Sequence, residues 1–72
     1  MNEYSRIVIE NYCMTHNSAK IRRLQALVEL SYDIAAEGTD IDAIYLERAI
    51  SREKDLELRK ALEDLDDFLF GC

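Results

Sequence analysis

The chain has 72 residues, of which 49% are apolar and 33% charged, a balance typical of a globular domain rather than a disordered segment. It contains no proline and only two glycines, and because sheets need such residues at their turns, an all-helical fold is favoured. The net charge of −6 disfavours nonspecific binding to nucleic acid or to an anionic membrane surface. We therefore expect a single all-α domain over residues 1–72, built as a small helical bundle.

The first predicted element is a short helix over residues 3–14. Tyr4, Ile7, Val8 and Tyr12 recur at helical spacing, although "RIVIE" also alternates like a strand. A single strand would have no partner in an otherwise helical chain, so the helix is the better interpretation. "THNS" follows as a connection, and its histidine has no matching metal ligands nearby, so we expect an ordinary loop residue.

The second predicted element is an amphipathic helix over residues 18–37. Its apolar residues gather on one broad face and its charged residues on the other, over about five turns. Asn17 or Ser18 is suited to cap its start, and Gly38 is suited to a left-handed position just past its end.

The third predicted element is a long helix over residues 40–70. Thr39 and Asp42, three residues apart, resemble a capping box at its start, and no residue breaks the pattern before Gly71. The wholly polar stretch 51–55 separates two halves whose apolar faces point in different directions. We therefore expect either a bend near 51–55 or different packing partners for the two halves.

The short "GT" connection predicts that the second and third helices form an antiparallel hairpin. Counting residues away from that turn places the start of the second helix beside residues 53–57. Three basic residues would then pair with three acidic ones across the hairpin. These residues are Lys20, Arg22 and Arg23 on one helix and Glu53, Asp55 and Glu57 on the other.

The end of the third helix would extend past its partner, because residues 40–70 outlast residues 18–37. Its apolar stripe would then need cover from the first helix, from a second copy of the chain, or from another protein. We interpret the stripe as a partner-binding surface with an acidic rim. We expect it to form a homodimer and also to bind a second protein, for which a basic protein is a candidate. The stripe comprises Leu58, Leu62, Leu65, Phe68, Leu69 and Phe70, and the rim comprises Glu63, Asp64, Asp66 and Asp67.

The sequence shows no phosphate-binding loop, nucleophile motif or metal-ligand spacing, and Cys13 and Cys72 form no recognisable framework. We therefore expect a non-enzymatic adaptor, chaperone or inhibitor that needs no cofactor. The chain begins without a signal-peptide pattern and has no apolar run of about 20 residues, so we expect a cytoplasmic protein outside the membrane.

Two alternatives remain open. Residues 37–72 hold eleven of the fifteen acidic residues, so this half could imitate nucleic acid and block a basic nucleic-acid-binding protein. However, duplex DNA carries one charge per ~1.7 Å, a far denser array than one helix offers. The other alternative is RNA binding by a helical-hairpin dimer through Lys20, Arg22 and Arg23.

Overall fold

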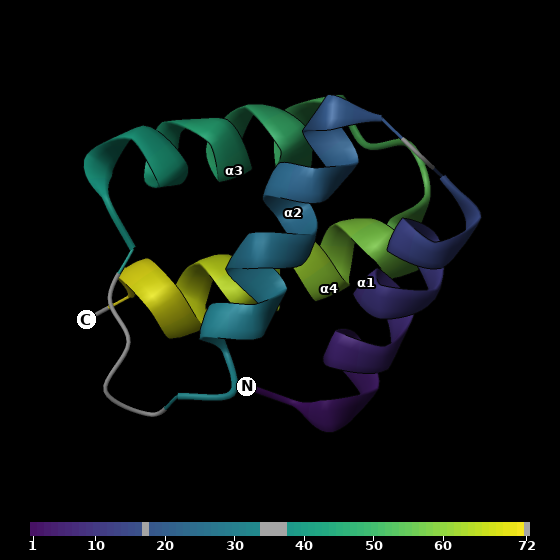
Figure 1. Ribbon diagram of the computed structural model, residues 1–72, viewed down its shortest axis with the longest axis horizontal. Coiled ribbons are helices and arrows are strands. Elements are labelled where there is room, and N and C mark those ends of the chain that lie inside the picture. Colours follow the sequence, from purple (N-terminus) through teal and green to yellow (C-terminus); the bar gives the residue numbers. More distant parts are fainter. Residues whose placement is uncertain (17, 34–37, 72) are drawn as a thin grey trace.

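The computed structural model describes residues 1–16, 18–33 and 38–71, and over these residues the chain is an all-helical bundle (Figure 1). Its helices are α1 (Glu3–Thr15), α2 (Ala19–Leu30), α3 (Asp40–Arg52) and α4 (Leu56–Phe70). α4 packs against both α1 and α3, and α1 also packs against α2. The predicted fold class is confirmed. Within the described ranges, no helix has the length and apolar character needed to cross a membrane.

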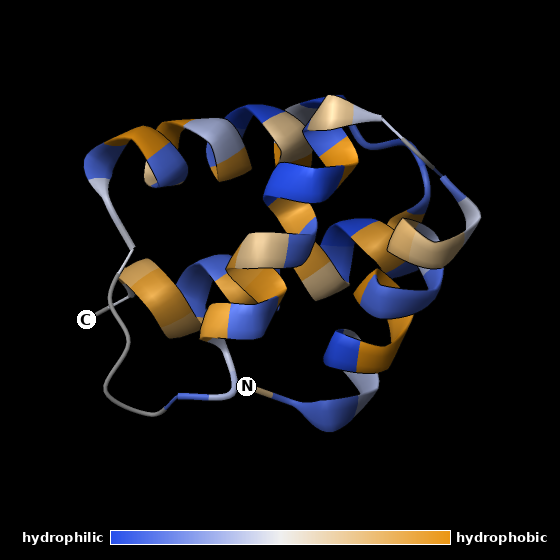
Figure 2. Cartoon of the chain, in the orientation of Figure 1, coloured by the Kyte–Doolittle hydropathy of each residue, from blue (hydrophilic) through white to orange (hydrophobic). Residues whose placement is uncertain are grey.

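Every helix contributes to one hydrophobic core, and α4 contributes the most residues. Apolar and polar positions alternate around each helix (Figure 2), so that each helix can turn one face inward. Fully burying a leucine or isoleucine side chain contributes about 1.5–3 kcal/mol, so this set is the main source of stability. The buried apolar residues are Ile9, Leu24, Leu27, Val28, Leu46, Leu58, Ala61, Leu62, Leu65 and Leu69.

The first helix agrees with the prediction, since α1 covers Glu3–Thr15 and is not a strand. Its start is capped by the side chain of Asn2, which accepts a hydrogen bond from the backbone N–H of Tyr4 at 2.8 Å. Ser18 caps α2 in the same way, as expected, while Asn17 lies outside the described residues. Local sequence therefore determines where both helices begin.

α2 ends at Leu30, so the prediction that it continues to residue 37 is wrong for residues 31–33, and residues 34–37 lie outside the described residues. The Ser31 hydroxyl donates to the Val28 carbonyl at 2.5 Å. The backbone N–H groups of residues 31–33 bond to carbonyls three residues back, a tighter turn that closes the helix. Arg6 of α1 also bonds to Ser31, so a tertiary contact helps to end α2 here.

Gly38 does not take the left-handed conformation expected of a helix cap, because no described glycine has a positive φ. It is needed for close packing instead. A Cβ atom built at Gly38 would lie 2.2 Å from two ring carbons of Phe70. Gly38 therefore lies directly against the side chain of Phe70 at the end of α4.

The prediction of one helix over residues 40–70 is also wrong, because residues 53–55 separate α3 from α4. The Glu53 carboxylate accepts hydrogen bonds from the backbone N–H groups of Lys54 and Asp55, both at 3.1 Å. Asp55 then caps α4 by accepting from the N–H groups of the next helix. The sequence correctly placed a change of helix direction or packing near residues 51–55, but the change is the end of α3 and the start of α4.

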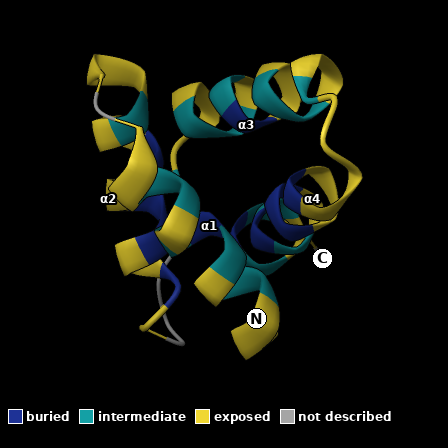
Figure 3. Ribbon diagram, turned by 90° about the vertical axis from the view of Figure 1, so that its right-hand side faces the viewer, coloured by how far each residue is buried: buried dark blue, intermediate teal, exposed yellow. Residues whose placement is uncertain are grey.

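α4 returns alongside α3 in the opposite direction (Figure 1). Its buried positions face the rest of the molecule (Figure 3), where α1 packs across them. The C-terminal part of the chain therefore does not extend past its neighbours. Of the three covers considered for the apolar stripe, the first helix is the one that packs on it.

Candidate functional site

The four leucines predicted to bind a partner lie in the core of the chain. Leu58, Leu62, Leu65 and Leu69 expose only 4%, 2%, 0% and 6% of their surface. The two phenylalanines at 68 and 70 are partly buried and pack against the same core. Because a buried side chain has no surface to offer a second molecule, the apolar stripe is chiefly structural in this conformation.

The acids predicted as the rim of that surface are in part structural as well. Asp64 accepts a hydrogen bond from the backbone N–H of Asn2 at 3.0 Å, which ties the start of the chain to α4. Glu63 pairs with Arg59 one turn earlier at 3.5 Å, an exposed and therefore weak interaction. Two of the four predicted rim carboxylates, those of Glu63 and Asp64, thus have partners within the described part of the chain.

Asp66 is partly buried, and its burial raises the pKa of its carboxyl above the ordinary value. The neighbouring charges of Asp67 and of Glu47 on α3 raise the pKa further. The last turn of α4 holds no basic residue to offset these charges or the negative end of the helix. Asp66 therefore destabilises the fold slightly when it is ionised.

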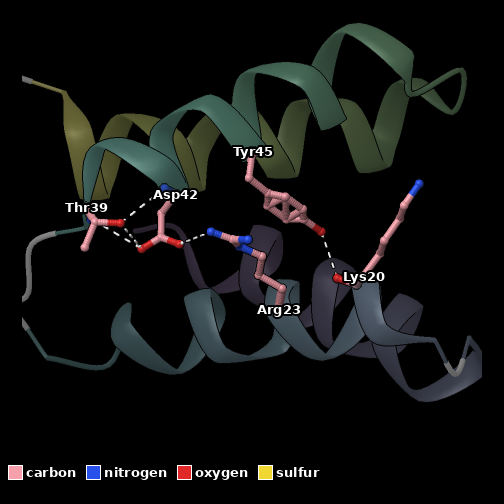
Figure 4. Close-up of polar contacts among 5 residues, drawn as sticks. All are labelled: Lys20, Arg23, Thr39, Asp42 and Tyr45. Carbon is pink, nitrogen blue, oxygen red and sulfur yellow. Dashed lines mark hydrogen bonds and ion pairs between the residues drawn. The ribbon is translucent and has the colours of Figure 1, made fainter.

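Polar contacts join α2 and α3 in the order of an antiparallel pair (Figure 4), although the two helices cross and pack on each other less than α3 packs on α4. Arg23 bonds to the Asp42 carboxylate at 3.2 Å, and the Tyr45 hydroxyl donates to the Lys20 carbonyl at 2.8 Å. The earlier residue of α2 thus contacts the later residue of α3. Arg23 also lies over the Tyr45 ring, with its Cζ atom 5.2 Å from the ring centroid.

The register of the hairpin differs from the predicted one. Arg23 pairs with Asp42 near the start of α3 and not with the carboxylates of residues 53–57. Glu57 instead accepts a hydrogen bond from the Tyr4 hydroxyl at 2.6 Å. The capping box at Thr39 is confirmed, and its hydroxyl, its backbone N–H and Arg23 together lower the pKa of Asp42.

A groove of about 710 Å³ lies between α2 and α3, and its size falls within the range of ligand and peptide sites. Leu24, Leu58 and Leu62 of the core form its apolar lining. Ile41 and Ile44 line it from α3 with 67% and 51% of their surfaces exposed. Because these two residues are one helical turn apart, they present a continuous apolar edge rather than scattered contacts.

Basic side chains border this groove on both helices. Lys20 and Arg23 come from α2, and Arg48 and Arg52 come from α3. Among the described residues, only Arg23 of these four has a carboxylate within ion-pair distance. The side chain of Lys20 extends away from the Tyr45 contact (Figure 4). A protein with a net charge of −6 thus concentrates positive charge along one apolar groove.

Sequence reasoning missed this groove, although a signal was present. The apolar residues of 40–50 spread around much of the helical wheel, so one face could not bury all of them. The excess residues, Ile41 and Ile44, are those left exposed in the groove. From the sequence, Lys20 and Arg23 are expected in ion pairs with the acidic residues of 53–57, and not as the border of a groove.

Cys13 and His16, two described residues of types that often take part in catalysis, each contact other parts of α1. Cys13 is half-buried, and its burial and the charge of Glu10 raise the pKa of its thiol, so the thiol stays protonated at neutral pH. His16 is the exposed cap of α1, and its ring stacks on Tyr12 with 4.1 Å between centroids. Cys72 lies outside the described residues.

Comparison with protein families, with curated proteins and with solved structures gives no match to this chain. Any functional proposal must therefore rest on the chemistry of its own surface.

Proposed function

We propose that this protein is a non-enzymatic protein-binding module and that the groove between α2 and α3 is its binding surface. The observation that carries the proposal is the exposed pair Ile41 and Ile44 on a groove whose floor is continuous with the core. Single exposed apolar residues are common on soluble proteins, but a contiguous apolar groove with polar edges marks an interaction site. Adaptor, chaperone and inhibitor are all roles that such a groove can serve.

The class of function is the one expected from the sequence, but the binding surface is the groove between α2 and α3 and not the stripe of residues 58–70. Partner binding by residues 58–70 would require Leu62 and Leu65 to leave the core, where they are 2% and 0% exposed. The cost of exposing even one such side chain is about 1.5–3 kcal/mol, a large part of the stability of so small a domain. The groove needs no such rearrangement.

The expected homodimer stays a prediction, but its original argument no longer applies. That argument required an apolar stripe left without cover by the same chain, and α1 supplies the cover. A second copy would have to use an exposed surface instead. Sedimentation in reducing buffer over a range of concentrations would measure whether the chain associates at all.

RNA binding by a hairpin dimer is a second candidate, because Lys20 and Arg23, two of the three bases in that alternative, border the groove, whereas Arg22 does not line it. Two observations favour a protein partner over RNA. Leucines line the groove beside the rings of Tyr12 and Tyr45, and the Tyr45 ring already lies under the Arg23 guanidinium, so it is not free for a base to stack on. A long polyanion would also meet the negative remainder of the molecule.

The acidic mimic of nucleic acid is supported less well, although it too stays a prediction. Two of its four central carboxylates are engaged by Asn2 and Arg59. Neutralising Asp66 and Asp67 to asparagine should leave partner binding unchanged if the groove is the binding surface. Loss of binding in that variant would instead favour the mimic.

The proposal is tested by affinity capture from the native host, followed by reconstitution with the purified partner. Ile44→Asp places a charge on the groove, while Leu56→Asp changes a residue that is 71% exposed and does not line it. We expect Ile44→Asp to weaken partner binding at least tenfold and Leu56→Asp to leave it unchanged, with both variants folded by circular dichroism. Equal binding by both variants would contradict the groove as the surface.

A further inference from the structure

We infer that the groove between α2 and α3 receives an acidic amphipathic helix from another protein. The inference rests on the proposed function, because it assumes a protein partner at the same groove. It adds the charge, the conformation and the spacing of contact residues that the partner must have.

The charge follows from the basic side chains that border the groove. Lys20, Arg48 and Arg52 have no carboxylate within ion-pair distance in the part of the chain that the structure describes. Glu53 is the one acidic residue among the described residues that line the groove. These positive charges lie at the edges, where they can attract a negatively charged partner without being desolvated first.

The distribution of charge also indicates where the partner carries its acids. Lys20 and Arg23 lie on the α2 edge, whereas Arg48 and Arg52 lie on the α3 edge one turn apart. A segment seated between the edges therefore meets positive charge on both sides and leucines beneath. The matching ligand has one apolar face flanked on each side by carboxylates.

The conformation follows from the shape of the floor and walls. α3 has 13 residues and spans about 20 Å, a length matched by about four turns of a docked helix. Helix-in-groove binding uses apolar residues at positions i, i+3 or i+4, and i+7, which lie on one face. Such a face would contact Ile41 and Ile44 on one wall and Ile21 on the other. A docked helix would extend the bundle by one element with the packing that the bundle already uses.

A second copy of this chain fits the groove less well. Its densest acidic segment, residues 63–67, lies on α4, but the leucines beside those acids are buried in their own core. The copy would thus supply charge without the apolar contacts that the floor requires. An extended nucleic acid would supply charge without apolar contacts in the same way.

A selection from a phage-displayed library of random 16-residue peptides tests the inference without presuming a sequence. The wild-type protein is the bait, and peptides that also bind the Ile44→Asp variant are removed. We expect the remaining peptides to carry net negative charge and apolar residues at i, i+3 or i+4, and i+7. Synthetic copies of them should become helical on binding by circular dichroism.

The contribution of the edges is measured with the double variant Arg48→Ala/Arg52→Ala. Its matched control is Arg22→Ala/Arg59→Ala, which removes the same charge from exposed positions outside the groove. By fluorescence anisotropy, we expect the first variant to bind a selected peptide at least tenfold more weakly and the control to bind within about twofold of wild type. Binding of the wild type should also weaken several-fold between 50 and 300 mM salt, as expected for about two or three charge pairs.

Each contrary result has a distinct meaning. Groove-dependent peptides that are neutral or basic, or that lack helical spacing, would overturn the inference and leave the proposed function standing. Self-association that Ile44→Asp abolishes would show that the occupant is a second copy. A 20-nucleotide RNA that binds the groove when no peptide does would overturn both the inference and the proposed function.

Discussion

The guanidinium group of Arg6 closes the C-terminal end of α2 by donating to both oxygen atoms of Ser31. Its Nε atom lies 3.1 Å from the Ser31 hydroxyl oxygen and its Nη2 atom 2.9 Å from the Ser31 carbonyl oxygen. α2 has no basic residue in its own last turn. A positive charge on a neighbouring helix therefore balances the negative end of α2 and fixes α1 against it.

We predict that Arg6→Ala lowers the free energy of unfolding by about 1–3 kcal/mol, because the oxygens of a nearly buried serine lose a charged donor. Ser31 is 2% exposed, so water cannot easily replace the guanidinium. The Arg6 side chain also lies 4.2 Å from the Tyr32 ring centroid, and this contact would be lost too. Urea denaturation followed by circular dichroism measures the change.

The matched control for this prediction is Arg22→Ala, which removes an exposed arginine with no ion pair among the described residues. Its expected effect is within about 0.5 kcal/mol. Equal destabilisation by the two substitutions would mean that loss of positive charge, and not the contact with Ser31, matters.

We predict that Leu65→Ala destabilises the domain by about 2–5 kcal/mol, because the side chain is 0% exposed and its removal leaves a cavity. In a domain of 72 residues this is enough to unfold much of the population. Leu56→Ala, at a position that is 71% exposed, should change the thermal midpoint little. A stable Leu65→Ala protein would show that the leucines of α4 are not the core, and would restore them as a candidate partner surface.

Features that depend on neighbours in sequence could be predicted. The start of α2 at Ser18 and the capping box of Thr39 and Asp42 follow from side chains within three residues of the groups they bond. The position of a change near residues 51–55 followed from the polar composition alone. These features need no knowledge of the tertiary fold.

Features that depend on distant residues could not be predicted. α2 stops at Leu30 partly because of Arg6, which lies 25 residues away from Ser31 in the chain. The polar stretch 53–55 could equally have been an exposed part of one long helix, so a break had no unique signal. The groove is formed by two helices and the core beneath them, so no single segment of sequence contains it.

We predict that Asp55→Ala destabilises the protein by about 1 kcal/mol, because its carboxylate accepts from the backbone N–H groups of Glu57 and Leu58 at the start of α4. Lys54→Ala, one residue earlier and also exposed, removes no cap and should change stability by less than about 0.5 kcal/mol. Thermal unfolding by circular dichroism distinguishes them. If Asp55→Ala is neutral, the Asp55 cap does not maintain the break between α3 and α4, which then depends on packing and on the Glu53 carboxylate.

The last prediction concerns the pH dependence of stability. Burial, Asp67 and Glu47 raise the pKa of Asp66 in the folded state above its value in the unfolded chain. Between these two values the folded state binds more protons, so the free energy of unfolding decreases as pH rises through this window. The destabilisation by ionised Asp66 reaches its full size above the folded-state pKa, and it is therefore present at pH 7.

Asp66→Asn should consequently raise the urea midpoint at pH 7, and the gain over wild type should shrink as the pH falls toward about 4, where an ordinary aspartate protonates. Asp67→Asn, at the adjacent exposed position, removes the same charge from the last turn of α4 and should give a smaller gain. The ionised carboxylate of Asp42 has the opposite effect and stabilises the fold, because the Thr39 hydroxyl lowers its pKa. This stabilisation is present at neutral pH and is lost only as the pH falls below the ordinary aspartate range. A gain from Asp66→Asn that stays constant between pH 7 and pH 4 would show that ionisation of Asp66 is not what destabilises the fold.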